Sequence, residues 1–290
     1  MLLNALKSSA RALFDRLSAR IPQPTTAQSP QQPANYPLEI EAERNRLHAA
    51  APLARHLDIL FAGEVCGGGR YVDLYREVLQ QTGTVVTPFN AFQRFQGRLN
   101  LARYFLRSLT LPGARVECGV YRGASALLLC RVARGIDPAY AGNDFYLVDS
   151  FQGASASGEH DLIPVRDGED GVRMQAFFPH AASDVSLAEV QRVFSDFRDV
   201  RIVKGWVPQV LAELPQTRWS FVHLEVDLYE PTLGALEYFF PRMSAGGITI
   251  TDDYGPIFTP GGRKAWQDFC ARHDVPYVVL DSGQAVIIKS

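Results

Sequence analysis

The sequence has little cysteine, no long apolar run and no excess of either charge. Its four cysteines (Cys66, Cys118, Cys130 and Cys270) lack C-x-x-C spacing, so neither a zinc cage nor a disulfide framework is indicated, and a reducing cytoplasm is the expected compartment. No apolar stretch reaches the roughly 18 to 20 residues that span a bilayer. Lysine and arginine total 29 against 31 aspartate and glutamate, a net charge of −2, which excludes a global positive field for binding nucleic acid.

The composition is that of a folded protein, with 47% hydrophobic and 21% charged residues. A length of 290 residues favours one α/β domain with an attached arm. We expect a helical N-terminal region over residues 38–114, with helices at 38–61, 71–81 and 91–109, and the main domain over 115–290.

Residues 1–37 are predicted to form an arm and a linker. Apolar side chains recur at helical spacing over residues 1–21, and the basic ones lie mostly off that face. Such a basic amphipathic helix can pack on a partner subunit, make weak membrane-surface contact or act as a targeting segment. We favour the first, which predicts a homo-oligomer. Residues 22–37 contain five prolines and are typical of an extended linker.

From residue 115 onward, short apolar runs alternate with helical stretches, the pattern of a doubly wound, mostly parallel sheet. The expected strands are 115–118, 145–148, 200–203, 221–226 and 247–251. Two further strands, 276–280 and 284–289, are joined by only three residues, which demands an antiparallel hairpin. The expected architecture is therefore a seven-stranded sheet that ends in a C-terminal antiparallel hairpin.

The first expected strand runs into a glycine turn. Gly119 and Gly123 allow a tight turn before a helix, whose N-terminal N–H groups can bind an anion. The turn lacks the middle glycine of G-x-G-x-x-G, which argues against a nicotinamide cofactor.

Asp149 ends the second expected strand. An acid at this position can accept both hydroxyls of a ribose, although it can also cap a helix. With the glycine turn, it indicates an adenosine-containing ligand. After the third strand, Trp206 either walls an adenine or closes the core, and the sequence does not decide between them.

Three aspartates follow the fourth and fifth strands. Asp227 precedes Asp252 and Asp253 by about one helical crossover and a strand, so neighbouring parallel strand ends would bring all three to one rim. Clustered carboxylates repel one another unless a cation or protons compensate. Oxygen-only ligands suit Mg²⁺ or Mn²⁺, so we predict a divalent-metal site.

These motifs, in this order, resemble the macrocin O-methyltransferase family over roughly residues 68–275. The segments that carry the resemblance are Tyr71–Leu74, Val116–Gly123, Val148–Gly153, Val226–Glu230 and Asp252–Gly255. The resemblance implies an S-adenosylmethionine-dependent, Mg²⁺-dependent enzyme with the class I methyltransferase fold, acting on a sugar hydroxyl of a natural product. The family commonly has Trp-Arg-Gly-Gly where this chain has Tyr121-Arg122-Gly123-Ala124.

The resemblance also implies residue roles. Glu117, Gly119 and Gly123 would shape the methionine end of the cofactor pocket, and Asp149 would hold the ribose. The three aspartates would bind the metal. The full set expected at the cofactor is Glu117, Gly119, Tyr121, Gly123, Ser125, Asp149, Ser150, Gly205, Trp206 and Asp227.

The reaction needs a base for the acceptor hydroxyl, and His160 is our preferred candidate, with Asp227 as the other catalytic residue. His160 lies in the polar segment 153–185, which we interpret as a lid, although a solvated loop histidine is an equal alternative. His180 and His223 are weaker candidates, and His223 is expected to point into the core. A capping box formed by Ser186 and Glu189 predicts a helix over 187–197.

Two other functions are compatible with the same sequence motifs. A catechol or small-phenol O-methyltransferase would have the same acids at its strand ends, and a non-catalytic adenosine-ligand module would keep the fold. Clustered carboxylates argue against the second, because a scaffold does not need them. The sequence does not identify the acceptor.

Overall fold

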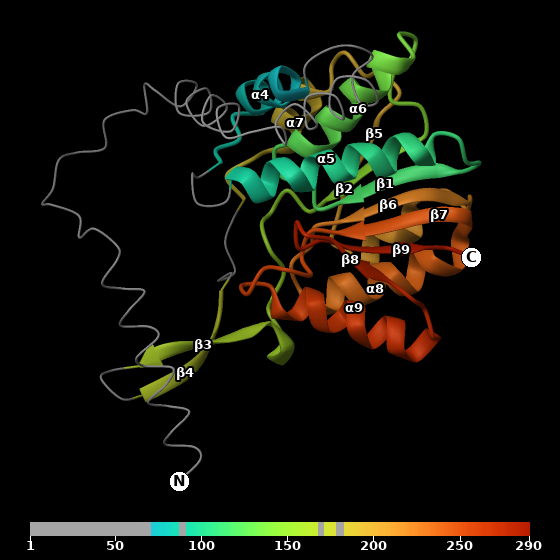
Figure 1. Cartoon of the computed structure of the whole chain (residues 1–290). Helices are drawn as coiled ribbons and strands as arrows, with labels where there is room; N and C mark the ends of the chain where they lie inside the picture. The colour runs from blue at the N-terminus through green and yellow to red at the C-terminus, as the bar shows by residue number, and fades with distance from the viewer. Residues whose placement is uncertain (1–70, 87–90, 168–170, 178–182) are drawn as a thin grey trace, which may run out of the picture. The chain divides into compact units, whose positions relative to one another are not determined.

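The computed structural model describes residues 71–86, 91–167, 171–177 and 183–290 (Figure 1). By its contacts the chain divides into Met1–Ala54 and Arg55–Ser290, and the described residues all belong to the second unit. The predicted arm and linker, the helix over 38–61 and His180 lie outside the described residues.

The core is a seven-stranded sheet. In spatial order its strands are β5 (Arg201–Lys204), β2 (Phe145–Asp149), β1 (Ala114–Cys118), β6 (Trp219–Leu224), β7 (Met243–Thr251), β9 (Ala285–Ile288) and β8 (Val278–Val279). The first five are parallel to one another, while β9 runs antiparallel to both β7 and β8. The predicted doubly wound sheet with a C-terminal antiparallel hairpin is confirmed.

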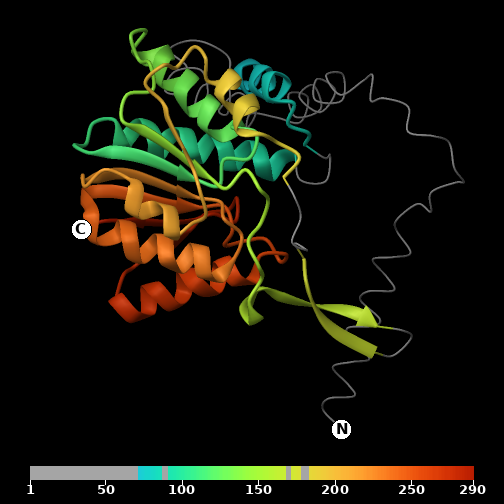
Figure 2. The same ribbon diagram turned by 180° about the vertical axis from the view of Figure 1, so that it is seen from behind.

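Helices cover both faces of the sheet (Figures 1 and 2). The α-helices are α4 (Tyr71–Thr82), α5 (Ala91–Ser108), α6 (Ala124–Ile136), α7 (Leu187–Val193), α8 (Tyr229–Phe239) and α9 (Pro260–His273). Helices α4, α5 and α6 pack together on one face, and α8 and α9 pack together on the other. The short 3₁₀ helices are η1 (Glu159–Asp161), η2 (Gln209–Glu213) and η3 (Phe240–Arg242).

The central strands β1 and β6 are buried along their whole length. Burial of both faces of a strand is expected where helices cover both sides of a parallel sheet. Phe105 of α5 packs against Phe145 and Phe221, with ring centroids 5.1 and 5.4 Å apart. Truncating such a buried ring to alanine costs about 3 to 5 kcal/mol, so this contact fixes α5 on the sheet.

The observed elements differ from the predicted ones in several places. Strand β7 begins at Met243, four residues earlier than predicted, and β8 spans only Val278–Val279. Strand β6 ends at Leu224, two residues earlier than predicted, and Asp227 beyond it has a left-handed φ of 62°. Helix α7 ends at Val193 instead of 197. Strand β5 leads into the short η2, not into an α-helix.

The polar segment after β2 contains an unpredicted antiparallel hairpin. Its strands are β3 (Leu162–Asp167) and β4 (Gly171–Ala176), which form a separate two-stranded sheet. The alternation of apolar and polar residues along β4 was a usable signal for a strand, but the Gly, Ser and Asp content of the surrounding segment outweighed it.

The predicted capping box of α7 is confirmed. Ser186 Oγ accepts the backbone N–H of Glu189, and the Glu189 carboxylate accepts the backbone N–H of Ser186. Within the described part of the chain, no helix is both long and apolar enough to cross a membrane.

Candidate functional site

The turn after β1 is a glycine turn, as predicted, and packing explains both glycines. Gly119 and Gly123 have φ values of 86° and 80°, in the left-handed region that favours glycine. A Cβ on Gly119 would collide with the backbone carbonyl of Glu225, and one on Gly123 would lie 2.7 Å from the Phe194 ring. The turn therefore lies directly against the segment that follows β6.

Asp149 at the end of β2 organises this turn. One of its carboxylate oxygens accepts the backbone N–H groups of Val120 and Tyr121 at 2.7 and 2.9 Å, and the other accepts that of Phe151 at 2.7 Å. Asp149 thus ties the loops after β1 and β2 together. A carboxylate has about four acceptor sites, so capacity for one further donor remains.

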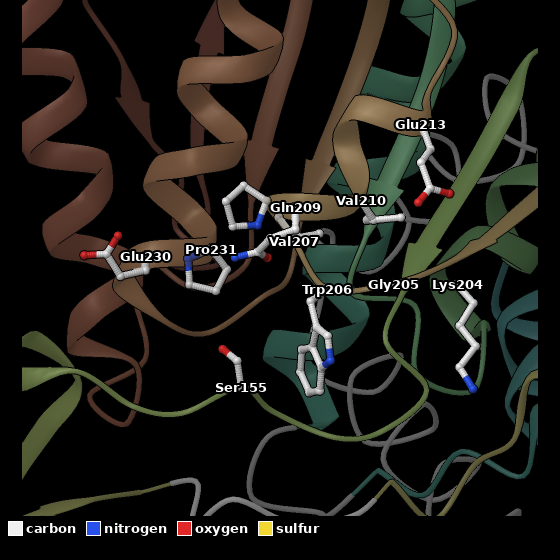
Figure 3. A pocket seen from close by; sticks show the side chains of 11 residues that line it. Ser155, Lys204, Gly205, Trp206, Val207, Gln209, Val210, Glu213, Glu230 and Pro231 are labelled. Atoms are coloured by element: carbon white, nitrogen blue, oxygen red, sulfur yellow. The ribbon is translucent and has the colours of Figure 1, made fainter.

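A cavity of about 410 Å³ lies beside the end of β5 (Figure 3). Gly205 and Trp206 follow β5, Glu230 and Pro231 belong to the first turn of α8, and Ser155 comes from the loop after β2. Trp206 is partly exposed and lines this cavity. Of the two alternatives for Trp206, closing the core is therefore excluded.

Glu117, Ser125 and His223 form a buried hydrogen-bonded group. Ser125 Oγ donates to Glu117 at 2.7 Å, and His223 Nδ1 lies 3.0 Å from the second Glu117 oxygen. Glu117 and His223 are both completely buried. The prediction that His223 points into the core is confirmed. Ser150 makes only a local turn, in which its hydroxyl donates to the carbonyl of Gly153.

Asp227 and Asp253 meet beyond the ends of β6 and β7. Asp253 is buried, and its Oδ2 accepts the backbone N–H of Asp227 at 2.8 Å. Burial, with the charge of Glu225, raises the pKa of Asp227 to about 7. Burial, with the charge of Asp227, also raises the pKa of Asp253 well above its usual range. Negative charge at this pair is therefore poorly compensated.

Asp252, the third predicted metal ligand, belongs to a different set of contacts. Its Oδ2 accepts from Arg98 Nη1 at 2.6 Å, and its Oδ1 accepts from Gln284 Nε2 at 2.6 Å. Its Oδ1 is also 3.5 Å from His223 Nε2. Although burial opposes the charge, Arg98 and His223 hold the pKa of Asp252 below its usual range. Asp252 is therefore a charge-compensated neighbour of the Asp227 and Asp253 pair.

Three residues of the site, Arg98, Glu225 and Gln284, were not predicted from the sequence. A fourth, His223, was considered only as a weaker candidate for the base. Arg98 lies on α5, in a region without any motif that indicates a site. Glu225 stands two positions before Asp227, which was the one signal that could have found it.

His160 belongs to the short helix η1, which lies beside the start of α8. Its ring packs on Tyr229 with centroids 4.3 Å apart, and its Nε2 is 3.8 Å from Glu159. The neighbouring Asp161 is buried, and its Oδ1 accepts the backbone N–H of Tyr229 at 2.8 Å. The segment after β2 is thereby attached to α8 two residues beyond Asp227.

A family model described as macrocin-O-methyltransferase (TylF) matches residues 94–284. The chain belongs to the macrocin O-methyltransferase (TylF) family. The matched segment contains every described site residue named above, from Arg98 on α5 to Gln284 before β9. The resemblance predicted from the strand-end motifs is confirmed.

Individual relatives agree with this family. The chain is 30% identical over 217 residues to "Mycinamicin III 3''-O-methyltransferase" of Micromonospora griseorubida, covering 73% of this chain and 81% of that protein. It is also 30% identical over 169 residues to "8-demethyl-8-(2,3-dimethoxy-alpha-L-rhamnosyl)-tetracenomycin-C 4'-O-methyltransferase" of Streptomyces olivaceus. That match covers 57% of this chain and spans only 60% of the relative's length.

Among solved structures, the O-methyltransferase NovP is similar to this chain. The TM-score is 0.53 at 26% sequence identity, and the likeness covers 68% of this chain and 80% of that structure. The class I methyltransferase fold expected for this family is thus the fold of the chain.

The donor set of the site suits a hard divalent cation. Asp227 and Asp253 offer carboxylate oxygens whose negative charge is poorly compensated, and oxygen donors are the ligands that Mg²⁺ and Mn²⁺ prefer. Asp252 lies in a different group, because its ligand atoms and those of His223 and Glu225 are all within 4.8 Å of one another. The carboxylate chemistry of Asp227 and Asp253 fits such an ion, and a direct role of Asp252 as a ligand stays a prediction.

Proposed function

We propose that this chain is an S-adenosylmethionine- and Mg²⁺-dependent O-methyltransferase whose acceptor is a sugar hydroxyl of a natural product. Family membership supports the reaction type. The rhamnosyl group in the name of one relative supports a sugar-containing acceptor. The observation that carries the proposal is the Asp227 and Asp253 pair, which lies beside the glycine turn.

The cofactor would lie across the ends of β1, β2 and β5. Asp149 retains one acceptor site for a ribose hydroxyl, next to the turn that it organises. Trp206 and Gly205 line a cavity whose aromatic wall suits an adenine. Tyr121, 51% exposed at the rim of the turn, is open to contact with the ligand.

Glu117 and Ser125 would act on the cofactor indirectly. Their buried hydrogen bond links β1, before the glycine turn, to α6, after it, and would hold the two ends of the turn together. Ser150 would support the loop after β2 in the same way. The cofactor contacts predicted for these side chains stay predictions.

S-adenosylmethionine supplies the methyl group, and a bound divalent cation makes the acceptor hydroxyl easier to deprotonate. The chain itself would hold the ion through Asp227, Asp253 and Asp252. It would also orient the acceptor oxygen toward the sulfonium methyl, because a displacement of this kind depends on alignment at about 3 Å.

His160 stays our preferred proton acceptor. Its ring packs on Tyr229, which is two residues beyond Asp227, and its side chain is 38% exposed, so an acceptor can reach it. The segment 153–185 would form a lid over the acceptor, held at Asp161.

A catechol or small phenol is the second candidate acceptor. It would chelate the same ion through two adjacent oxygens, and the described residues do not distinguish it from a sugar diol. A non-catalytic adenosine-binding module is disfavoured, since it would not need the poorly compensated carboxylates of Asp227 and Asp253.

The test is transfer of labelled methyl from S-adenosylmethionine to a panel of glycosylated natural products and catechols. We expect transfer to a sugar hydroxyl, loss of transfer in EDTA and recovery with Mg²⁺ or Mn²⁺. Asp227→Asn and Asp252→Asn should stay folded and lose activity. Sustained transfer in metal-free buffer would refute the metal dependence, and turnover of catechols alone would reassign the acceptor.

Three predictions about the setting of the protein stay predictions. These are a homo-oligomer, weak membrane-surface contact through residues 1–21 and a cytoplasmic location. Free buried Cys118, Cys130 and Cys270 agree with a reducing compartment.

A further inference from the structure

Arg98 bridges two acids of the site. Its Nη1 lies 2.6 Å from Asp252 Oδ2, and its Nη2 lies 3.2 Å from Glu225 Oε2. The Arg98 side chain is 11% exposed. Helix α5 thus delivers a guanidinium to the point where β6 and β7 end.

Without Arg98, the acids Glu225 and Asp252 would resemble a binding site for a metal cation. Ligand atoms of His223, Glu225 and Asp252 all lie within 4.8 Å of one another. Three such donors can bind a metal ion, but here a guanidinium already compensates the two carboxylates.

The fixed geometry of Asp252 depends on the same residue. Gln284 Nε2 donates to its second oxygen at 2.6 Å, so Arg98 and Gln284 hold the carboxylate from both sides. A guanidinium can bind two carboxylates at once because its donors form a planar fork. A lysine ammonium in its place would keep the charge, but not the fork.

We propose that Arg98 is a positioning residue that takes the place of a second cation in the active site. It holds Glu225 and Asp252 beside the divalent ion of Asp227 and Asp253, and its positive charge limits how strongly the acids attract cations. This inference rests on the proposed metal-dependent methyl transfer.

The Arg98→Gln variant distinguishes this role from a purely structural one. Arg98→Gln removes one positive charge close to the cation site, so Mn²⁺ should bind more tightly, by about tenfold or more. Methyl transfer should fall in the same variant, because Glu225 and Asp252 lose their common partner. Mere loosening of the structure would weaken Mn²⁺ binding and activity together.

Arg98→Lys separates charge from geometry. It should leave Mn²⁺ affinity within about threefold of wild type, because the charge is retained, yet lower methyl transfer, because the fork is lost. Arg107→Gln is the matched control on the same helix. Arg107 is exposed and donates to Thr110 outside the site, so neither property should change.

The experiment is titration of the full chain with Mn²⁺. Binding is measured by calorimetry and by electron paramagnetic resonance of free Mn²⁺, and circular dichroism establishes that each variant is folded. Tighter Mn²⁺ binding by Arg98→Gln than by wild type supports the proposal. A wild type that binds no Mn²⁺ refutes the proposed metal dependence and overturns this inference with it. Unchanged or weaker binding by folded Arg98→Gln overturns it. If Arg98→Gln does not fold, an Arg98→Lys affinity far from wild type overturns it, and an affinity near wild type with reduced transfer supports it.

Discussion

His223 Nδ1 lies 3.0 Å from Glu117 Oε2, and neither side chain reaches solvent. Burial by itself would favour the neutral imidazole, but Asp252 and Glu117 outweigh it and raise the pKa of His223 to about 10. The centre of the sheet therefore contains a charged histidine between two carboxylates, one under the glycine turn and one at the rim of the site.

The first prediction is that His223 stays protonated well above neutral pH. Because its pKa is raised on folding, the stabilisation is fully present below about pH 6.5 and is lost as the pH rises through about 10. Side-chain nitrogen NMR at pH 8 should show a charged imidazole that is absent from His223→Gln. A neutral ring at pH 8 would contradict the assignment.

The second prediction concerns cation binding and pH. Since Asp227 has a pKa of about 7, protons compete with the ion, and Mg²⁺ affinity should fall as the pH drops from 8 to 6. In the metal-free protein, the contribution of Asp227 to stability is present below about pH 4 and is lost as the pH rises through about 7.

Mg²⁺ should therefore raise the melting temperature more at pH 8 than at pH 6. Calorimetric titration and thermal unfolding in EDTA or Mg²⁺ measure both effects, with Asp227→Asn as the control that reduces them. Equal Mg²⁺ affinity at the two pH values would argue against this carboxylate as a ligand.

The third prediction concerns Asp149. Asp149→Ala should weaken binding of S-adenosylhomocysteine by roughly 2 to 4 kcal/mol, because it removes a ribose acceptor and frees the N–H groups of Val120 and Tyr121. Asp149→Asn keeps one carbonyl oxygen and should lose less. Calorimetric titration with S-adenosylhomocysteine measures both, and unchanged affinity in Asp149→Ala would remove the ribose role.

The fourth prediction tests the base. His160→Ala should lower kcat by about 10²-fold while S-adenosylhomocysteine affinity stays near that of wild type, since a general base acts on a proton of the acceptor. His273→Ala is the control, because His273 contacts Glu237 at the far end of α9. Full activity of His160→Ala would make His160 a loop residue.

The fifth prediction concerns the attachment of the lid. A Cβ on Gly261 would collide with Asp161, whereas a Cβ on Gly158 would be in ordinary contact at 3.6 Å. A Cβ on Gly261 would also lie 2.7 Å from the backbone N of Tyr229, so it would displace both partners of the hydrogen bond between Asp161 and Tyr229. Gly261→Ala should therefore destabilise the protein by about 1 to 3 kcal/mol, and Gly158→Ala should not. Thermal unfolding and the rate of proteolysis within 153–185 measure the difference. Equal behaviour of the two variants would contradict this role of Asp161.

The sequence by itself determined the fold and the rim on which the site is built. Short apolar runs such as 145–148, alternating with helical stretches, indicate strands of a parallel sheet, and a three-residue link such as 281–283 joins antiparallel ones. The carboxyl ends of parallel strands share one edge, so Asp149, Asp227 and Asp253 could be placed at that edge from their positions alone.

The tertiary structure alone decided which charges compensate each other. Arg98 and Asp252 are 154 positions apart, and no local pattern predicts that a helix before the sheet supplies a guanidinium to the end of β7. The split between the paired Asp252 and the poorly compensated Asp227 and Asp253 follows from those contacts. Electrostatic compensation acts over a few ångströms in a desolvated site, and such distances are set by packing.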